Sequence, residues 1–164
     1  MKTISKLIND NLSGCYSVGE ISALTRIIVT ELLGISQMAF YLKDDITLSA
    51  EQQSLLDNAI ERLKKQEPIQ YILGYSDFCG LRFKVTPATL IPRPETSELV
   101  EWVASEATDR ERILDIGTGS GCIAVSLAHK IPQSKVTAWD ISHDALDVAT
   151  ENSKANSCAV AFEQ

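Results

Sequence analysis

A glycine-rich segment in the second half of the chain is the part best suited to bind a ligand. It reads Asp115-Ile-Gly-Thr-Gly-Ser-Gly121 and lies between an apolar strand predicted at 112–116 and a helix predicted at 122–130. Glycines permit a sharp turn and let a ligand approach the backbone closely. The candidate cofactor-binding loop therefore consists of Gly117, Thr118, Gly119, Ser120 and Gly121.

An acidic residue completes this candidate site. Asp140 follows the next predicted strand, 135–139, and stands nineteen residues after Gly121. Ligands of open α/β sheets bind outside the carboxyl ends of the strands, where an acid about 20 residues beyond a glycine loop accepts hydrogen bonds from ribose hydroxyls. Ile141, the next residue, joins the candidate cofactor-binding set. Asp115, near the end of the first strand, can orient the loop or meet a cationic group of the ligand.

The spacing of the glycines limits the class of ligand. The pattern G-x-G-x-G differs from the G-x-G-x-x-G of dinucleotide sites, which disfavours a nicotinamide cofactor. No P-loop lysine follows the glycines, which disfavours a nucleoside triphosphate. A tight strand-to-helix turn without any ligand is the structural alternative.

Metal and redox chemistry find little support in the sequence. The cysteines, at 15, 79, 122 and 158, form no closely spaced pair, and neither histidine has a partner at metal-ligand spacing. Zinc sites and redox dithiols need such pairs. We therefore predict four reduced thiols and no metal site.

The second half of the chain is predicted to form an α/β domain. Strands at 112–116, 135–139 and 158–162 alternate with helices at 122–130 and 142–156. This alternation is typical of a parallel sheet. A helix at 95–107 precedes them, with Leu99, Val100, Trp102 and Val103 expected to face inward.

The first 70 residues are predicted to form a helical bundle. Capping-box sequences begin helices after Ser17 and Ser49, and Gly34 and Pro68 end them. Short helices are also expected at 2–11 and 36–43. The sequence thus predicts a helical domain at 1–68, a β-hairpin linker at 69–92 and an α/β domain at 93–164.

Composition and charge limit the classes of function that remain. The chain has 164 residues, 45% of them hydrophobic and 23% charged, as in ordinary globular proteins. It shows no secretory signal and no apolar run near the ~20 residues that a bilayer crossing needs, so we expect a cytoplasmic protein. The net charge is −7, and residues 91–164 carry six basic and twelve acidic side chains. This acidity argues against a nucleic-acid partner.

Further segments beside the glycine loop carry a resemblance to a known family. They are Glu67-Pro-Ile-Gln-Tyr-Ile-Leu-Gly74, Leu90-Ile-Pro-Arg-Pro-Glu-Thr96 and Ala138-Trp-Asp-Ile-Ser142. Together they resemble the HemK-type release factor glutamine N5-methyltransferases, of the class I S-adenosylmethionine-dependent superfamily. The resemblance spans essentially the whole chain and is closest over 67–152. It implies an α/β protein with an N-terminal helical bundle, a β-hairpin linker and the first half of a Rossmann-like class I methyltransferase sheet.

The resemblance also implies an activity. Members of this family transfer a methyl group from S-adenosylmethionine to the side-chain amide of the glutamine in the Gly-Gly-Gln loop of peptide-chain release factors. The helical domain would help to dock the release factor, and we expect a monomer. The family implies that the segment formed by Arg93, Pro94, Glu95 and Thr96 lines the active site. A helix start at Pro94 with an Arg93–Glu98 ion pair is the structural alternative, and Ser97 stands where the family usually has an acid.

One family signature is absent from the 164 residues. The family positions its substrate amide with an Asn-Pro-Pro-Tyr motif after the fourth strand, and no such string occurs here. We therefore expect a fragment or a truncated product, without catalytic residues of its own and inactive as written, in which strand 112–116 becomes a sheet edge. The alternatives are a non-catalytic module that binds a release factor or the cofactor, and an adenine N6-methyltransferase.

Overall fold

The computed structural model describes residues 2–42, 46–108 and 111–164. The chain divides into two compact units, Met1–Leu73 and Gly74–Gln164, each with its own hydrophobic core. Residue 43, the expected end of one short helix, lies outside the described residues.

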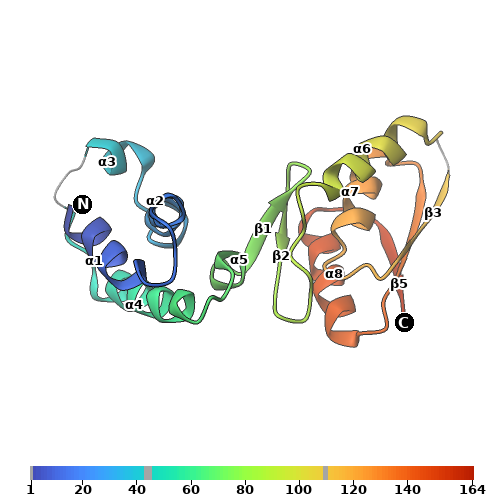
Figure 1. The fold of residues 1–164 in the computed structure, drawn as a ribbon. Helices are drawn as coiled ribbons and strands as arrows, with labels where there is room; N and C mark the ends of the chain where they lie inside the picture. The colour runs from blue at the N-terminus through green and yellow to red at the C-terminus, as the bar shows by residue number, and fades with distance from the viewer. Residues whose placement is uncertain (1, 43–45, 109–110) are drawn as a thin grey trace. The chain divides into compact units, whose positions relative to one another are not determined.

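The first unit is built from helices, as predicted (Figure 1). Its core consists of apolar side chains that recur at helical spacing, among them Ile8, Leu12, Ile28 and Leu56, all fully buried. In chain order the elements are α1 (Lys2–Leu12), α2 (Val18–Ile27), the π-helical turn η1 (Ile28–Leu32), α3 (Gln37–Leu42), α4 (Ala50–Lys64) and α5 (Ile69–Leu73).

Both predicted capping boxes are present. The Ser17 hydroxyl accepts from the Glu20 N–H, and the Glu20 carboxylate accepts from the Ser17 N–H at 2.8 Å. Ser49 and Gln52 form the same pair at the start of α4. The Gln52 amide also donates to the Leu33 carbonyl at 2.8 Å, so this cap ties the start of α4 to the end of η1.

The prediction of a β-hairpin from residue 69 onward is wrong over its first five residues. Ile69–Leu73 forms the short helix α5, which begins after Pro68. The Pro68 carbonyl accepts hydrogen bonds from the N–H groups of Tyr71 and Ile72. Ile69 and Ile72, three residues apart, pack against the core of the first unit. Helical spacing of these two side chains therefore outweighs the β-propensity of the segment.

The hairpin itself lies in the second unit. Strands β1 (Tyr75–Phe78) and β2 (Leu81–Lys84) pair antiparallel. The rings of Phe78 and Phe83 meet edge to face at 6.1 Å and are buried in the core of that unit.

A parallel three-stranded sheet forms the centre of the second unit. Its order is β3 (Arg112–Ile116), β4 (Lys135–Trp139) and β5 (Val160–Glu163), so β3 is an edge strand, as predicted. The helices α6 (Thr96–Glu106), α7 (Cys122–Lys130) and α8 (His143–Ala155) lie on one side of the sheet (Figure 1). These bounds match the predicted alternation of strands and helices.

Two side chains of α6 were expected to face inward and do not. Leu99 is 43% exposed and Trp102 is 61% exposed, and the indole N–H of Trp102 donates to the Glu106 carboxylate. The buried face of α6 carries Val100 and Val103, at i, i+3 spacing. Leu99 and Trp102 each precede one of these residues by one position, which turns them toward solvent.

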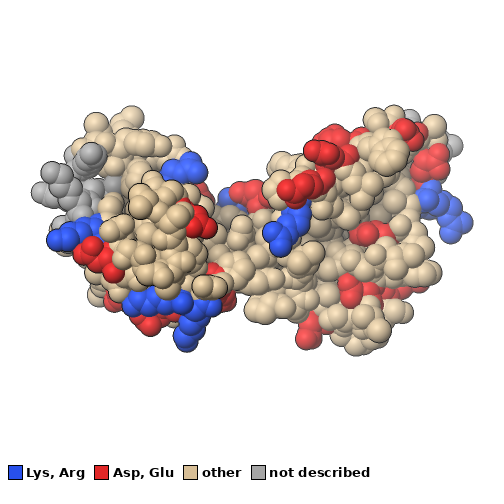
Figure 2. Space-filling model, in the orientation of Figure 1, with Lys and Arg blue, Asp and Glu red and all other residues tan. Residues whose placement is uncertain are grey.

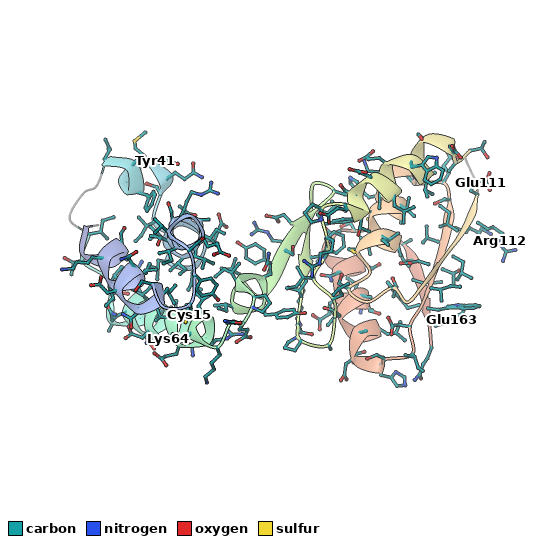
Figure 3. The ribbon with its side chains drawn as sticks, viewed as in Figure 1. Cys15, Tyr41, Lys64, Glu111, Arg112 and Glu163 are labelled. Carbon is teal, nitrogen blue, oxygen red and sulfur yellow. The ribbon has the colours of Figure 1, made fainter. Side chains whose placement is uncertain are left out.

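The other face of the sheet is open. Leu114 and Ile116 on β3 and Trp139 on β4 are 46%, 74% and 41% exposed, and Arg112 projects from β3 away from the helices (Figure 3). A hollow of about 690 Å³ lies along this face. Both apolar and polar side chains line it, among them Leu114, Lys135 and Thr137.

Candidate cofactor site

The glycine loop is anchored to the carboxyl end of the neighbouring strand. Gly117, Gly119 and Gly121 all have positive φ angles, of 77°, 55° and 78°. Only glycine adopts this conformation without strain. The N–H groups of Gly117 and Thr118 donate to the Trp139 carbonyl at 2.8 and 2.9 Å. The end of β4 therefore fixes where the loop begins.

The structure brings the predicted acid and the predicted loop together. One carboxylate oxygen of Asp140 accepts from the Gly119 N–H at 2.8 Å, and the other accepts from the Ser142 N–H at 2.9 Å. Asp140 is half-buried. Each oxygen keeps a free lone pair, since a carboxylate accepts about four hydrogen bonds. Asp140 thus holds the loop while its remaining acceptor capacity stays available to a ligand.

Asp115 orients the loop, one of the two roles expected for it. Its carboxylate accepts from the Thr118 hydroxyl at 2.7 Å. Thr118 is buried, with 6% of its surface exposed. A charge-assisted hydrogen bond of this length restrains the first turn of the loop.

A pocket of about 450 Å³ opens beside the loop. Its wall is largely apolar, and Ile141, one of the residues that line it, is 91% exposed. The indole N–H of Trp139 donates to the Glu163 carboxylate at 3.2 Å, and the Gln164 amide donates to the Ile141 carbonyl at 3.2 Å. The residues that line it are Ile116, Gly117, Trp139, Asp140, Ile141, Glu163 and Gln164. An apolar wall beside a hydrogen-bonding carboxylate fits a nucleoside, whose base is flat and whose ribose carries hydroxyls.

Trp139, Glu163 and Gln164 were not among the predicted site residues. The signal that could have found them is topological. Parallel strands end at the same edge of a sheet, so residues at the ends of β4 and β5 must lie beside the glycine loop.

The segment from Arg93 to Thr96 forms the turn that begins α6. Arg93, Pro94 and Glu95 are exposed, and the Thr96 N–H donates to the Arg93 carbonyl at 3.0 Å. Within the described ranges, no ion pair joins Arg93 to Glu98 and none of the four residues lines the pocket at the loop. A role in lining an active site stays a prediction.

Cys122, the cysteine beside the loop, has a protonated thiol near neutral pH. Burial raises the pKa of the Cys122 thiol to about 11, so this thiol is neutral near pH 7.

In the part of the chain that the structure describes, no three His, Cys, Asp or Glu side chains gather closely enough to hold a metal ion. Over the same residues, no helix has the length and apolar composition that a membrane crossing requires.

Two protein families match the chain. The PrmC N-terminal domain matches residues 10–74, and the methyltransferase small domain matches residues 95–164. The glycine loop and Asp140 both lie within the second match.

Curated relatives agree with these matches. A release factor glutamine methyltransferase of Bacteroides thetaiotaomicron is 48% identical over all 164 residues, which cover 59% of that protein. The protein of the same name from Flavobacterium psychrophilum is 41% identical over 92% of this chain and 55% of its own length. Among solved structures, a tRNA (uracil-54, C5)-methyltransferase of Pyrococcus abyssi matches 54% of this chain and 22% of its own, with 20% identity and a TM-score of 0.46. This match is too partial to indicate the family or the function of the chain.

The chain spans little more than half the length of these two curated relatives. The PrmC N-terminal match falls almost entirely in the helical unit, and the methyltransferase match falls in the α/β unit. The identity to the Bacteroides protein extends over the whole chain. The chain therefore resembles proteins named release factor glutamine methyltransferases over its whole length, with 48% identity to the Bacteroides protein.

Proposed function

We propose that this chain binds S-adenosylmethionine at the glycine loop and supplies the cofactor-binding part of a methyltransferase that acts on release-factor glutamine. The observation that carries the proposal is the hydrogen bond from Gly119 to Asp140 at the edge of an apolar pocket. It places a carboxylate with free acceptor capacity beside a loop that a ligand can approach closely.

The residues around the pocket suit the parts of the cofactor. Asp140 would accept hydrogen bonds from the ribose hydroxyls. Ile116 and Ile141, 74% and 91% exposed, offer apolar surface to the adenine ring. When bound, S-adenosylmethionine supplies an electrophilic methyl group on a sulfonium sulfur.

The proposed acceptor is the side-chain amide nitrogen of a glutamine in a release factor, as the names of the relatives suggest. An amide nitrogen is a weak nucleophile because its lone pair is delocalised. Transfer to it requires groups that hold the amide and align that lone pair with the methyl group. The family does this with Asn-Pro-Pro-Tyr, which the 164 residues do not contain. We therefore expect this polypeptide by itself to hold the cofactor without transferring its methyl group.

Surface charge favours a protein acceptor over a nucleic acid. The helix α6 carries Glu98, Glu101 and Glu106. On the face of the second unit that Figure 2 shows, the Lys and Arg side chains of the described residues are scattered and form no continuous track. Neutralisation of phosphates by such a track supplies most non-specific binding to nucleic acids. An adenine N6-methyltransferase thus finds no support on this surface.

Two assays test the proposal. Equilibrium dialysis with labelled S-adenosylmethionine should show binding by the 164-residue chain. Incubation of chain and cofactor with a purified release factor, followed by mass spectrometry of the Gly-Gly-Gln peptide, should show no methylation. Absence of binding refutes the cofactor site, and robust methylation refutes the claim that the chain alone is inactive.

A further inference from the structure

A buried amide on α8 joins the glycine loop to the hairpin. Asn152 is 1% exposed. Its side-chain nitrogen donates to the Ser120 carbonyl at 2.9 Å and to the Lys84 carbonyl at 3.0 Å. Its side-chain oxygen accepts from the Lys84 N–H at 2.6 Å. One side chain therefore holds two segments that are far apart in the sequence.

The bond to Ser120 fixes a specific peptide unit of the loop. The carbonyl of Ser120 and the N–H of Gly121 belong to the same peptide plane. That N–H donates to the Thr118 carbonyl at 2.9 Å, while the carbonyl accepts from Asn152. Both polar groups of the plane are thus engaged, which sets its orientation next to Gly119, the residue that faces Asp140.

A second contact shows that the same face of α8 supports the loop. A Cβ atom at Gly121 would lie 3.0 Å from the Cβ of Ala149. Ala149 precedes Asn152 by three residues and so lies on the same face of the helix. This face approaches the loop backbone closely and hydrogen-bonds to it.

Asn156, the residue that follows α8, contacts the hairpin and the last turn of its own helix. Its amide donates to the Arg82 carbonyl at 3.0 Å and to the Asn152 carbonyl at 2.9 Å. Within the described residues, no hydrogen bond joins the Asn156 side chain to the loop. Lys84 of the hairpin also pairs with Glu151 of α8 at 2.5 Å. Three side chains of this region, Asn152, Asn156 and Glu151, therefore bind the hairpin, and of these three only Asn152 also binds the loop.

We propose that Asn152 is a positioning residue for the cofactor loop: it fixes the Ser120–Gly121 peptide in the binding conformation and couples the loop to the hairpin. The inference deepens the proposed function and rests on it for its consequence in cofactor binding. The coupling itself is a property of the chain without ligand.

The sharpest variant is Asn152→Asp, which preserves size and keeps an acceptor for the Lys84 N–H. It replaces the donor that faces the Ser120 and Lys84 carbonyls with an oxygen. The buried Ser120 carbonyl and the part-buried Lys84 carbonyl then lose their partner, and the dissociation constant for S-adenosylhomocysteine should rise about tenfold. Ser153→Ala is the matched control, because Ser153 is buried on the same helix and bonds to the Cys158 carbonyl rather than to the loop. It should lower stability and leave the affinity of the folded chain unchanged.

Amide spectra of the ligand-free chain separate this inference from the proposed function. Asn152→Asp should shift the NMR signal of the Gly121 amide and speed hydrogen exchange in both the loop and β2. Asn156→Ala should speed exchange in β2 and at the end of α8 but leave the loop unchanged. A loop that is unchanged in Asn152→Asp, or altered equally by Ser153→Ala, overturns the inference. If the unsubstituted chain binds no cofactor, the proposed function fails, while the exchange pattern still decides whether Asn152 positions the loop.

Discussion

The carboxylate of Asp140 accepts a hydrogen bond from the backbone N–H of Gly119 at 2.8 Å, although the two residues follow different strands. Parallel pairing of β3 and β4 brings these strand ends together. The contact joins the two features of the sequence that most strongly indicate a nucleoside site. It also means that the acid organises the loop before any ligand arrives.

Alanine at Gly121 should be more damaging than alanine at Gly117. Both positions have positive φ, near 78°, so each substitution carries a strain of about 1–2 kcal/mol. Only Gly121 also lacks room, since its Cβ would lie 3.0 Å from Ala149, which adds about 1–3 kcal/mol of overpacking. Urea denaturation of the two variants measures the difference. Equal losses of stability would show that the packing of α8 on the loop is not tight.

Removal of the Thr118 hydroxyl should loosen the loop. Thr118→Val deletes the donor to the Asp115 carboxylate and should lower the free energy of unfolding by about 1–2 kcal/mol. Thr118→Ser keeps the hydroxyl and serves as the control. If valine and serine give the same stability, the 2.7 Å contact does not contribute to the fold.

The ion pair between Arg62 and Glu67 should make the first unit sensitive to acid. Two hydrogen bonds from Arg62 hold the pKa of the Glu67 carboxyl below its ordinary value of 4.5. Because the folded pKa lies below the unfolded one, the stabilisation is complete above the unfolded pKa and is lost as pH falls through the folded pKa. Glu67→Gln should therefore be less stable than the unsubstituted chain at neutral pH and equally stable in strong acid.

Circular dichroism of the helices during urea denaturation, repeated from neutral to acid pH, measures this convergence. Glu61→Gln is the control, since the Glu61–Lys64 pair is more exposed and joins neighbouring turns of one helix. A difference between Glu67→Gln and the unsubstituted chain that stays constant with pH would argue against the ion pair as its cause.

The four thiols should react in an order set by burial. Cys15 is exposed, whereas Cys122 is buried with its pKa raised to about 11. Because the thiolate is the reactive form, iodoacetamide near neutral pH should modify Cys15 first and Cys122 only after unfolding. Mass spectrometry of timed samples reports the order. Modification of native Cys122 at the rate of Cys15 would contradict the packing around α7.

Local patterns predicted most of the elements because they depend on neighbouring residues. The capping boxes at Ser17 and Ser49 and the glycine loop are examples, and their helices and strands appear where expected. The short helix α5 was missed because Ile69 and Ile72 take their environment from the core of the first unit. Burial of Leu99 and Trp102 was wrongly predicted because their apolar character does not reveal which face of α6 meets α7.

Part of the candidate site was predictable because it, too, depends on a local sequence pattern. Gly117–Gly121 and Asp140 belong to one local βαβ pattern and could be paired by spacing. Asn152 and Glu163 could not, because their contacts depend on how α8 and β5 pack. An asparagine on the apolar face of a helix was the available signal for Asn152, since a buried amide must find partners.

Calorimetric titration of the 164-residue chain with S-adenosylhomocysteine tests the central claim most directly. We expect measurable binding that Asp140→Ala weakens by about 1.5–3 kcal/mol, through loss of a charge-assisted hydrogen bond. Asp147→Ala removes the same charge from an exposed position on α8 and should leave the affinity unchanged. An affinity that is the same with and without the Asp140 carboxylate would contradict the assignment of this loop and acid as the cofactor site.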